Sequence, residues 1–233
     1  MQVVNGIIYI IGGTNGTIIL NSVHCFDPVN SKWYHRANLS EARCYVSTVV
    51  LDNIIYALGG HNGRDRMRSC EKYNTETDQW TPIHNMNIIR SDASACVCNG
   101  KIFIAGGLNG LMIEDTVEYY DPATDTWTHL ISLIVPRSSL SLVCYHDSLY
   151  AIGGNNGFQR YVFSSKNIIL TFYYRLSQVE RYDFTRREWS PAPNMMQRRS
   201  TLAGCVFNDA IYVFGGYNGI KFIHLIYSFN LSI

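Results

Sequence analysis

Residues 54–63 read Ile-Ile-Tyr-Ala-Leu-Gly-Gly-His-Asn-Gly, and a variant of this ten-residue segment occurs five times in the chain. The copies begin at residues 7, 54, 101, 148 and 210, so three successive intervals are 47 residues long and the fourth is 62. Every copy keeps an apolar run, a Gly-Gly pair and an Asn-Gly pair. A regular period of this length is typical of a repeat protein in which each repeat forms one structural unit.

Three further markers keep the same register. A Trp follows the second Gly by 20 residues in the first three repeats and by 35 in the fourth, so the fourth repeat contains 15 additional residues. An Arg follows each Trp by ten residues, and an aromatic residue with Asp or Asn after it precedes each Trp by seven. The Trp residues are Trp33, Trp80, Trp127 and Trp189, and the Arg residues are Arg43, Arg90, Arg137 and Arg199.

The local patterns between these markers predict β-strands. Residues 45–51 and 54–58 are runs of β-branched and aromatic residues joined at Asp52-Asn53, which is typical of a hairpin. The Gly-Gly pair ends the second strand. A third strand carries the aromatic residue that recurs seven residues before each Trp, and a fourth strand begins at the Trp. Four antiparallel strands in 47 residues predict one blade of an all-β propeller.

The amino-acid composition agrees with an all-β propeller and limits the classes of partner that the chain would attract. Hydrophobic residues make up 47%, aromatic residues 13% and charged residues 16% of the 233, which favours half-buried sheet surfaces over long solvated helices. The formal net charge of +1 gives no general attraction to nucleic acid or to an anionic membrane. We find no signal peptide and no apolar run of about 18 residues, so we expect a cytoplasmic protein.

The cysteines lack the paired spacing of a structural zinc site. We therefore expect buried free thiols and no metal. Cys96 and Cys98 lie two residues apart in a predicted strand, so both should face the same side of a sheet. The seven cysteines are Cys25, Cys44, Cys70, Cys96, Cys98, Cys144 and Cys205.

The motifs Ile-Tyr-x-x-Gly-Gly, Val-Glu-x-Tyr-Asp, Trp and Met-x-x-x-Arg resemble the kelch repeat over residues 1 to about 219. The strict spacing is similar to that of BTB-BACK-kelch (kelch-like) proteins. This resemblance implies a kelch β-propeller of six blades, of which the chain would supply about four and a half, and the ring would therefore be incomplete. It also implies that the Trp and Tyr residues fill the space between adjacent blades and are structural.

The repeat register assigns the chain to one propeller, residues 1–233, with blades at about 1–40, 41–87, 88–134, 135–196 and 197–219. We expect the fifth blade to have only its first two strands. Residues 161–175 are an insertion, because their removal restores the repeat, and residues 220–233 form an atypical tail. We interpret both segments as translated intron; the alternative for 161–175 is an apolar loop that projects from the fourth blade and contacts a partner or lipid.

The resemblance implies a protein-interaction function. In kelch-like proteins the propeller selects substrates, while BTB and BACK segments, which are absent from these 233 residues, engage a cullin-3 ubiquitin ligase. The substrate surface lies at one mouth of the ring, at three positions of each repeat. Carried over, the first set is Thr14, His61, Leu108, Asn155 and Tyr217; the second is Ile19, Arg66, Ile113, Arg160 and Phe222; the third is Cys44, Ser91, Ser138 and Ser200.

Arginines near the second blade suggest the chemistry of the partner. Arg64, Arg66 and Arg68 alternate along a predicted hairpin, so all three should point the same way and grip a carboxylate or a phosphorylated peptide. The competing interpretation is an ordinary solvated loop. We favour a contact role for Arg66 because its position matches the second set.

No catalytic motif is present in the sequence. We find no Gly-x-x-x-x-Gly-Lys-Ser/Thr, Gly-x-Ser-x-Gly or His-Glu-x-x-His, and the histidines occupy different repeat positions. We therefore expect no catalytic residues, no cofactor and no nucleic-acid or membrane partner. The first hypothesis is a substrate-recognition module of a ubiquitin ligase adaptor, the second an actin-binding cytoskeletal protein, and the third a propeller enzyme.

Overall fold

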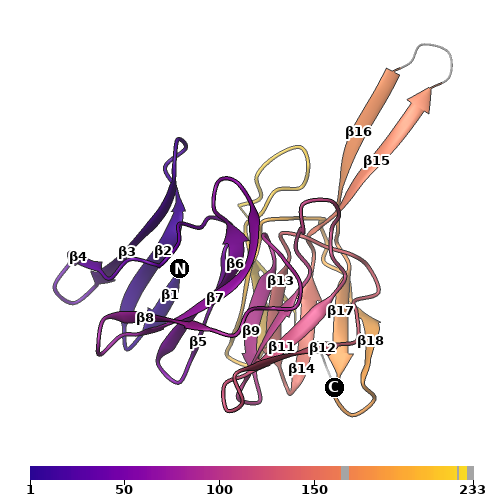
Figure 1. Cartoon of the computed structure of the whole chain (residues 1–233). Helices are drawn as coiled ribbons and strands as arrows, with labels where there is room; N and C mark the ends of the chain where they lie inside the picture. The colour runs from indigo at the N-terminus through magenta and orange to yellow at the C-terminus, as the bar shows by residue number, and fades with distance from the viewer. Residues whose placement is uncertain (164–167, 225, 230–233) are drawn as a thin grey trace.

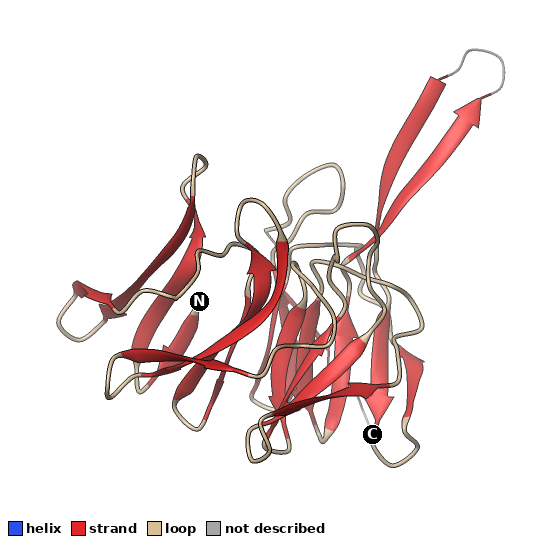
Figure 2. Ribbon diagram, in the orientation of Figure 1, coloured by secondary structure: helices blue, strands red, loops and turns tan. Residues whose placement is uncertain are grey.

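The computed structural model describes residues 1–163, 168–224 and 226–229, and the side chains of residues 1–157, 174–224 and 226–228. This part of the chain consists of strands, turns and loops and contains no helix (Figure 2). The strands form five antiparallel sheets, which we call blades one to five, and one separate hairpin. The all-β propeller predicted from the repeat is therefore confirmed.

Blades one to four each contain four strands, and blade five contains three. Blade one comprises β1 (Gln2–Val4), β2 (Ile7–Thr14), β3 (Ile19–Asp27) and β4 (Lys32–Arg36). Blade two comprises β5 (Ser47–Leu51), β6 (Ile54–His61), β7 (Arg66–Asn74) and β8 (Gln79–Ile83). Blade three comprises β9 (Ser94–Cys98), β10 (Lys101–Ala105), β11 (Val117–Asp121) and β12 (Thr126–Leu130).

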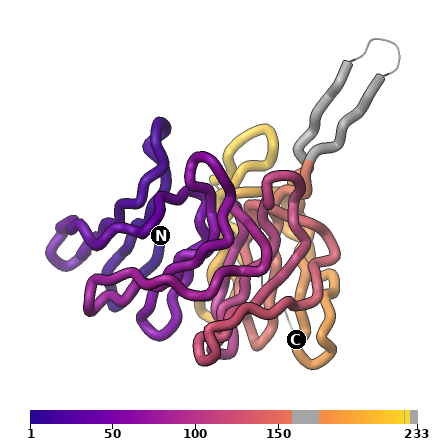
Figure 3. The backbone as a smooth tube through the Cα atoms, in the orientation of Figure 1, coloured from indigo at the N-terminus to yellow at the C-terminus, as the bar shows by residue number. Residues whose placement is uncertain are grey.

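Blade four comprises β13 (Ser141–Tyr145), β14 (Ser148–Ile152), β17 (Val179–Asp183) and β18 (Glu188–Ala192), and blade five comprises β19 (Ala203–Phe207), β20 (Ala210–Phe214) and β21 (Ile226–Phe229). The first strands of successive blades contact one another, so they are the innermost strands of the array. Figures 1 and 3 show the chain passing from the indigo first blade at one side of the molecule through the magenta and orange blades in turn.

The repeated turns follow from residues that tolerate left-handed backbone. Asp52 and Asn53 join β5 to β6 with φ values of 52° and 61°, which is the geometry of a tight two-residue hairpin. At the end of β6, Gly59 has a φ of 60°, and a Cβ there would clash with the carbonyl oxygen of Arg90. The Gly-Gly pair is therefore needed for the close approach between the blade and the segment that leaves it.

The repeated Trp joins each blade to the segment that precedes it. Trp127 Nε1 donates a hydrogen bond to the carbonyl oxygen of His84 at 2.8 Å, and its ring is only 8% exposed. Trp80 and Trp189 make the equivalent bonds to the carbonyl oxygens of Ala37 and Ile131. Trp33 of blade one is 59% exposed, because the structure places no preceding segment against it. Three of the four Trp rings therefore fill the space between blades as predicted.

The repeated Arg forms the other connection between blades. The backbone of Arg90 pairs with Gly60 and Met67 of blade two, while its guanidinium donates to the carbonyl oxygens of Gly106 and Thr116 of blade three. The same guanidinium pairs with the Glu118 carboxylate at 2.8 Å, and both side chains are 0% exposed. Arg43 with Glu71 and Arg137 with Glu180 repeat this buried ion pair in blades two and four.

One expectation about the irregular segments needs revision. Blade five has three strands instead of the two predicted, because residues 226–229 pair with β20 even though the Val-Glu-x-Tyr-Asp motif is absent there. The insertion falls within a hairpin of β15 (Asn155–Phe163) and β16 (Ile168–Arg175), which belongs to no blade. Leu176 N donates to Gly154 O, as Glu114 N does to Gly107 O in blade three, so the repeat register resumes at Leu176.

The prediction that all seven cysteines are free thiols was wrong for two of them. Cys98 and Cys144 form a disulfide between β9 and β13, with a Cα–Cα distance of 5.6 Å. The two residues are 46 apart in sequence, but they lie on the innermost strands of neighbouring blades. The spacing of the cysteines along one sequence does not reveal this pair. The two residues meet only because the innermost strands of neighbouring blades contact each other.

We expect Trp127→Ala to lower the free energy of unfolding by about 3 to 5 kcal/mol, because it leaves a cavity between blades two and three and removes the hydrogen bond to His84. Trp33→Ala is the matched control and should change the free energy by less than about 1 kcal/mol, since that ring is exposed. Urea unfolding followed by circular dichroism measures both. Equal losses in the two variants would contradict the role of the Trp between blades.

We expect Glu118→Gln to destabilise the protein by about 3 to 5 kcal/mol, because it leaves the buried Arg90 charge without its counter-charge. Asp121→Asn removes the partner of Lys101 in a partly exposed pair and should cost about 1 kcal/mol or less. Thermal and urea unfolding of both variants test this. If Glu118→Gln were as stable as Asp121→Asn, the buried pair would not hold the blades together.

Candidate binding face

The loops that follow the Gly-Gly pairs and the repeated Arg residues meet on one side of the blades, which we call the mouth. In blade two the residue after Gly-Gly, His61, exchanges two backbone hydrogen bonds of 2.9 Å with Cys44, the residue after Arg43. The same bridge recurs in each later blade, so the first and third predicted sets lie directly beside each other. The equivalent bridges are Ser91 with Leu108, Ser138 with Asn155 and Ser200 with Tyr217.

A chain of backbone hydrogen bonds connects the blades at the mouth. It runs through the second residue after each repeated Arg: Asp92 N donates to Tyr45 O, Ser139 N to Asp92 O, and Thr201 N to Ser139 O, at 2.7 to 3.0 Å. These residues have left-handed φ values of 51° to 56° although none is glycine. Such backbone persists only where the surrounding structure fixes it, so the mouth is a rigid, preorganised surface.

Residues of the second set pair with those of the first and lean toward the next blade. His61 pairs with Arg66, Leu108 with Ile113, and Tyr217 with Phe222. Arg66 Nη1 lies 3.9 Å from the position that a Cβ would take on Gly110 of blade three. Blades one to four therefore each present one second-set side chain, Ile19, Arg66, Ile113 or Arg175, beside the Asn-Gly turn of the next blade.

In blade four the second-set residue is Arg175 instead of the predicted Arg160. Asn155 pairs with Arg175 in the hairpin, as His61 pairs with Arg66 in blade two. The side chain of Arg160 lies outside the described residues. Counting back 14 residues from the Trp identifies Arg66 and Arg175 alike, whereas counting forward from Gly-Gly fails in blade four because the insertion intervenes. The sequence therefore did contain a signal for Arg175.

Arg66 is held in place by a polar network. Its Nε donates to Ser91 Oγ at 3.0 Å, and Ser91 Oγ donates in turn to the Asp92 carboxylate at 2.7 Å. Burial raises the pKa of Asp92, while its bond with Ser91 and the charge of Arg66 act in the opposite direction. The Arg66 guanidinium keeps its other donor nitrogens for a partner, because only Nε is used in this network.

The three predicted serines do not form part of the exposed surface. Ser91 is 1% exposed, Ser138 6% and Ser200 5%. They are buried because each one bridges to the loop of its own blade through its backbone. The serines therefore position the surrounding residues instead of contacting a partner directly.

The predicted row of three arginines is wrong for Arg64. Arg64 lies in a turn in which the Asn62 side chain accepts hydrogen bonds from the amides of Arg64 and Asp65. Strand alternation therefore begins only at Arg66, the first residue of β7, and does not extend to Arg64. Arg68 lies two residues further along β7 and lines a shallow pocket with Met86 and Asn87.

Apolar groups complete the mouth beside the two arginines. Leu108 and Ile113 of blade three are half-buried and paired, and Phe222 of blade five is 69% exposed. The rings of Tyr217 and Phe222 lie 5.3 Å apart, and the Arg175 guanidinium stands 5.0 Å from the centre of the Tyr217 ring. The mouth therefore combines cationic groups on blades two and four with apolar groups on blades three and five.

The described residues carry no group of three or more His, Cys, Asp or Glu side chains placed to bind a metal ion. In the same part of the chain, no helix has the length and apolar character needed to cross a bilayer.

Comparison with known proteins agrees with this architecture. Residues 1–154 match the family model described as the KLHDC2/KLHL20/DRC7 Kelch-repeats domain, and residues 136–196 and 198–232 match the Kelch motif. A solved structure entitled "Structure of YjhT" superposes with a TM-score of 0.85 at 16% sequence identity, over 99% of this chain and 80% of that one. At this identity the likeness shows the fold alone. The chain belongs to the family of KLHDC2/KLHL20/DRC7-type kelch-repeat domains.

Proposed function

We propose that this kelch-repeat protein binds an acidic segment of a partner protein at the mouth. The observation that carries the proposal is the placement of Arg66 and Arg175 at equivalent positions of blades two and four, on either side of the apolar pair Leu108 and Ile113. Guanidinium groups bind carboxylates in bidentate geometry, and apolar contacts between them would supply affinity. The rigid mouth loses little entropy on association.

We further propose that the chain is the substrate-recognition propeller of a cullin-3 ubiquitin ligase adaptor in the cytoplasm. The support is the resemblance of the repeats to those of kelch-like proteins. In addition, the segments Arg43-Cys-Tyr-Val-Ser and Arg90-Ser-Asp-Ala-Ser resemble the sequence of kelch-like protein ten. In that scheme BTB and BACK segments would contact cullin-3, and the mouth described above would hold the substrate.

We expect Arg66→Ala and Arg175→Ala each to weaken binding of a glutamate-rich peptide about tenfold, because one charge-assisted hydrogen bond is worth roughly 1.5 kcal/mol. Fluorescence anisotropy with a labelled peptide, and with the same peptide carrying Gln for Glu, measures the effect. Arg64→Ala is the matched control, since Arg64 is a nearby exposed arginine outside the network. Wild-type affinity in both Arg66→Ala and Arg175→Ala, with an unchanged melting temperature, would rule out the mouth as the peptide site.

The ligase role has a separate test. A transcript of the gene should carry an upstream BTB reading frame in frame with these repeats, and its full-length product should co-purify with cullin-3. A transcript without that frame, or a full-length product that does not retain cullin-3, would contradict the adaptor role and leave peptide binding at the mouth unaffected.

A further inference from the structure

A carboxylate recurs at the junction between blades, on the turn from the third strand to the fourth. In blade three, Asp125 Oδ1 accepts hydrogen bonds from the Tyr120 hydroxyl at 2.7 Å and from the His84 amide at 3.0 Å. His84 lies in the segment that leaves blade two, so this one carboxylate bridges two blades. Asp78 makes the same two bonds in blade two, with the Tyr73 hydroxyl and the Ala37 amide.

Blade four keeps this turn but reverses the charge. Arg187 stands at the position of Asp125, two residues before the repeated Trp, with a φ of 56° against 52° for Asp125. Tyr182 is the equivalent of Tyr120, and Ile131 is the equivalent of His84. Within the described part of the chain, neither the Tyr182 hydroxyl nor the Ile131 amide has a hydrogen-bond partner. The donors of the repeated bridge are thus present, and their acceptor is missing.

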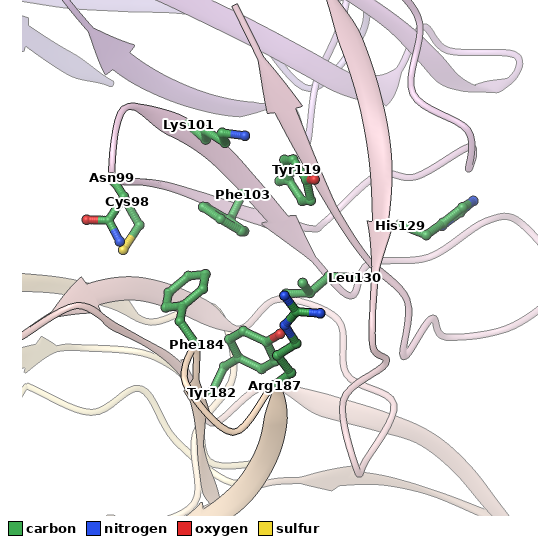
Figure 4. Close-up of a pocket in the computed structure, with 10 residues that line it drawn as sticks. All are labelled: Cys98, Asn99, Lys101, Phe103, Tyr119, His129, Leu130, Tyr182, Phe184 and Arg187. Atoms are coloured by element: carbon green, nitrogen blue, oxygen red, sulfur yellow. The ribbon is translucent and has the colours of Figure 1, made fainter.

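A pocket of about 500 Å³ opens at this junction between blades three and four (Figure 4). Phe184 stands where blade three has Pro122. Its ring makes edge-to-face contacts with the rings of Phe103 and Tyr182, with 5.5 Å and 5.0 Å between ring centres. Figure 4 shows the Arg187 side chain beside Tyr182 and directed toward Leu130. The pocket therefore has apolar aromatic walls on one side and a cationic group with a phenol donor on the other.

We propose that this pocket binds a small organic carboxylate, whose anionic group replaces the missing Asp side chain. The carboxylate accepts hydrogen bonds from the Tyr182 hydroxyl and the Ile131 amide and pairs with the Arg187 guanidinium. An apolar body of the ligand packs against Phe103 and Phe184. The volume lies in the range of ordinary small-molecule sites.

The other groups of the pocket are consistent with this ligand. Burial raises the pKa of Tyr182, so its hydroxyl stays protonated and remains a donor at neutral pH. Lys101 already pairs with Asp121 at 2.9 Å, and its ammonium lies 4.9 Å from the Tyr119 ring centre. Arg187 is therefore the cation that the ligand would neutralise. The site is separate from the mouth, because it is built on the turn between the third and fourth strands instead of the Gly-Gly loops.

The probe is 2-naphthoate, measured by isothermal titration calorimetry with the full chain. We expect it to bind, whereas the neutral isostere 2-naphthamide and acetate, which lacks the apolar body, should each bind at least about tenfold more weakly. Arg66→Ala should bind 2-naphthoate like wild type, which separates this pocket from the mouth. Equal binding of the naphthoate and the naphthamide would overturn the proposal.

The decisive variant restores the repeat. Arg187→Asp supplies the missing carboxylate to Tyr182, so it should raise the melting temperature and weaken 2-naphthoate binding at least about tenfold. Tyr182→Phe keeps the ring and should weaken binding several-fold, while Arg186→Gln, on the same turn but outside the pocket, should change nothing. Should Arg187→Asp be poorly folded, Arg187→Gln gives the same test of affinity. Unchanged affinity in the folded Arg187 variant would overturn the site.

Discussion

The buried pair of the repeated Arg with a Glu on the third strand is the interaction on which the rest of the structure depends. Arg90 is bonded to blade two through its backbone and to blade three through its side chain, so one residue belongs to two blades. Glu118 also accepts hydrogen bonds from the amides of Asn87 and Ile88 in the connecting segment. A charge buried at 0% exposure is tolerable because both Nη atoms of Arg90 and both carboxylate oxygens of Glu118 are hydrogen-bonded, whereas Arg90 Nε has no partner in the described structure.

This constraint also shapes the mouth. Because the backbone of each repeated Arg is fixed, the next residue must bridge to the Gly-Gly loop, and the residue after that must take a left-handed φ to reach its neighbour. Rigidity at the mouth is thus a by-product of the bond between blades. The side chains that vary there, such as Arg66, Ile113 and Arg175, stand on a scaffold that does not vary from blade to blade.

Where a blade departs from the repeat, the packing between blades does not explain which residue is present. Blade four departs twice: the hairpin β15–β16 leads from the mouth, and Arg187 replaces a bridging Asp at the opposite turn. In blade five, Tyr227 stands where blades two to four have the buried Glu. A repeat protein supplies its own internal reference for each position, so a single sequence is enough to recognise such exceptions.

The sequence by itself determined the all-β propeller and its 47-residue repeat, because strands, turns and a fixed period are local properties of the chain, and the resemblance to kelch repeats implied the structural role of the Trp residues. It also indicated which loops share one face, since equal register places equal positions at equal points of each blade. It did not show that the three serines are buried or that Cys98 meets Cys144, and counting from Gly-Gly selected Arg160, whereas the register of the hairpin places Arg175 opposite Asn155. Only the tertiary structure decided the burial of the serines and the disulfide, because both depend on neighbours that are distant in the sequence, 46 residues away in the case of Cys98 and Cys144.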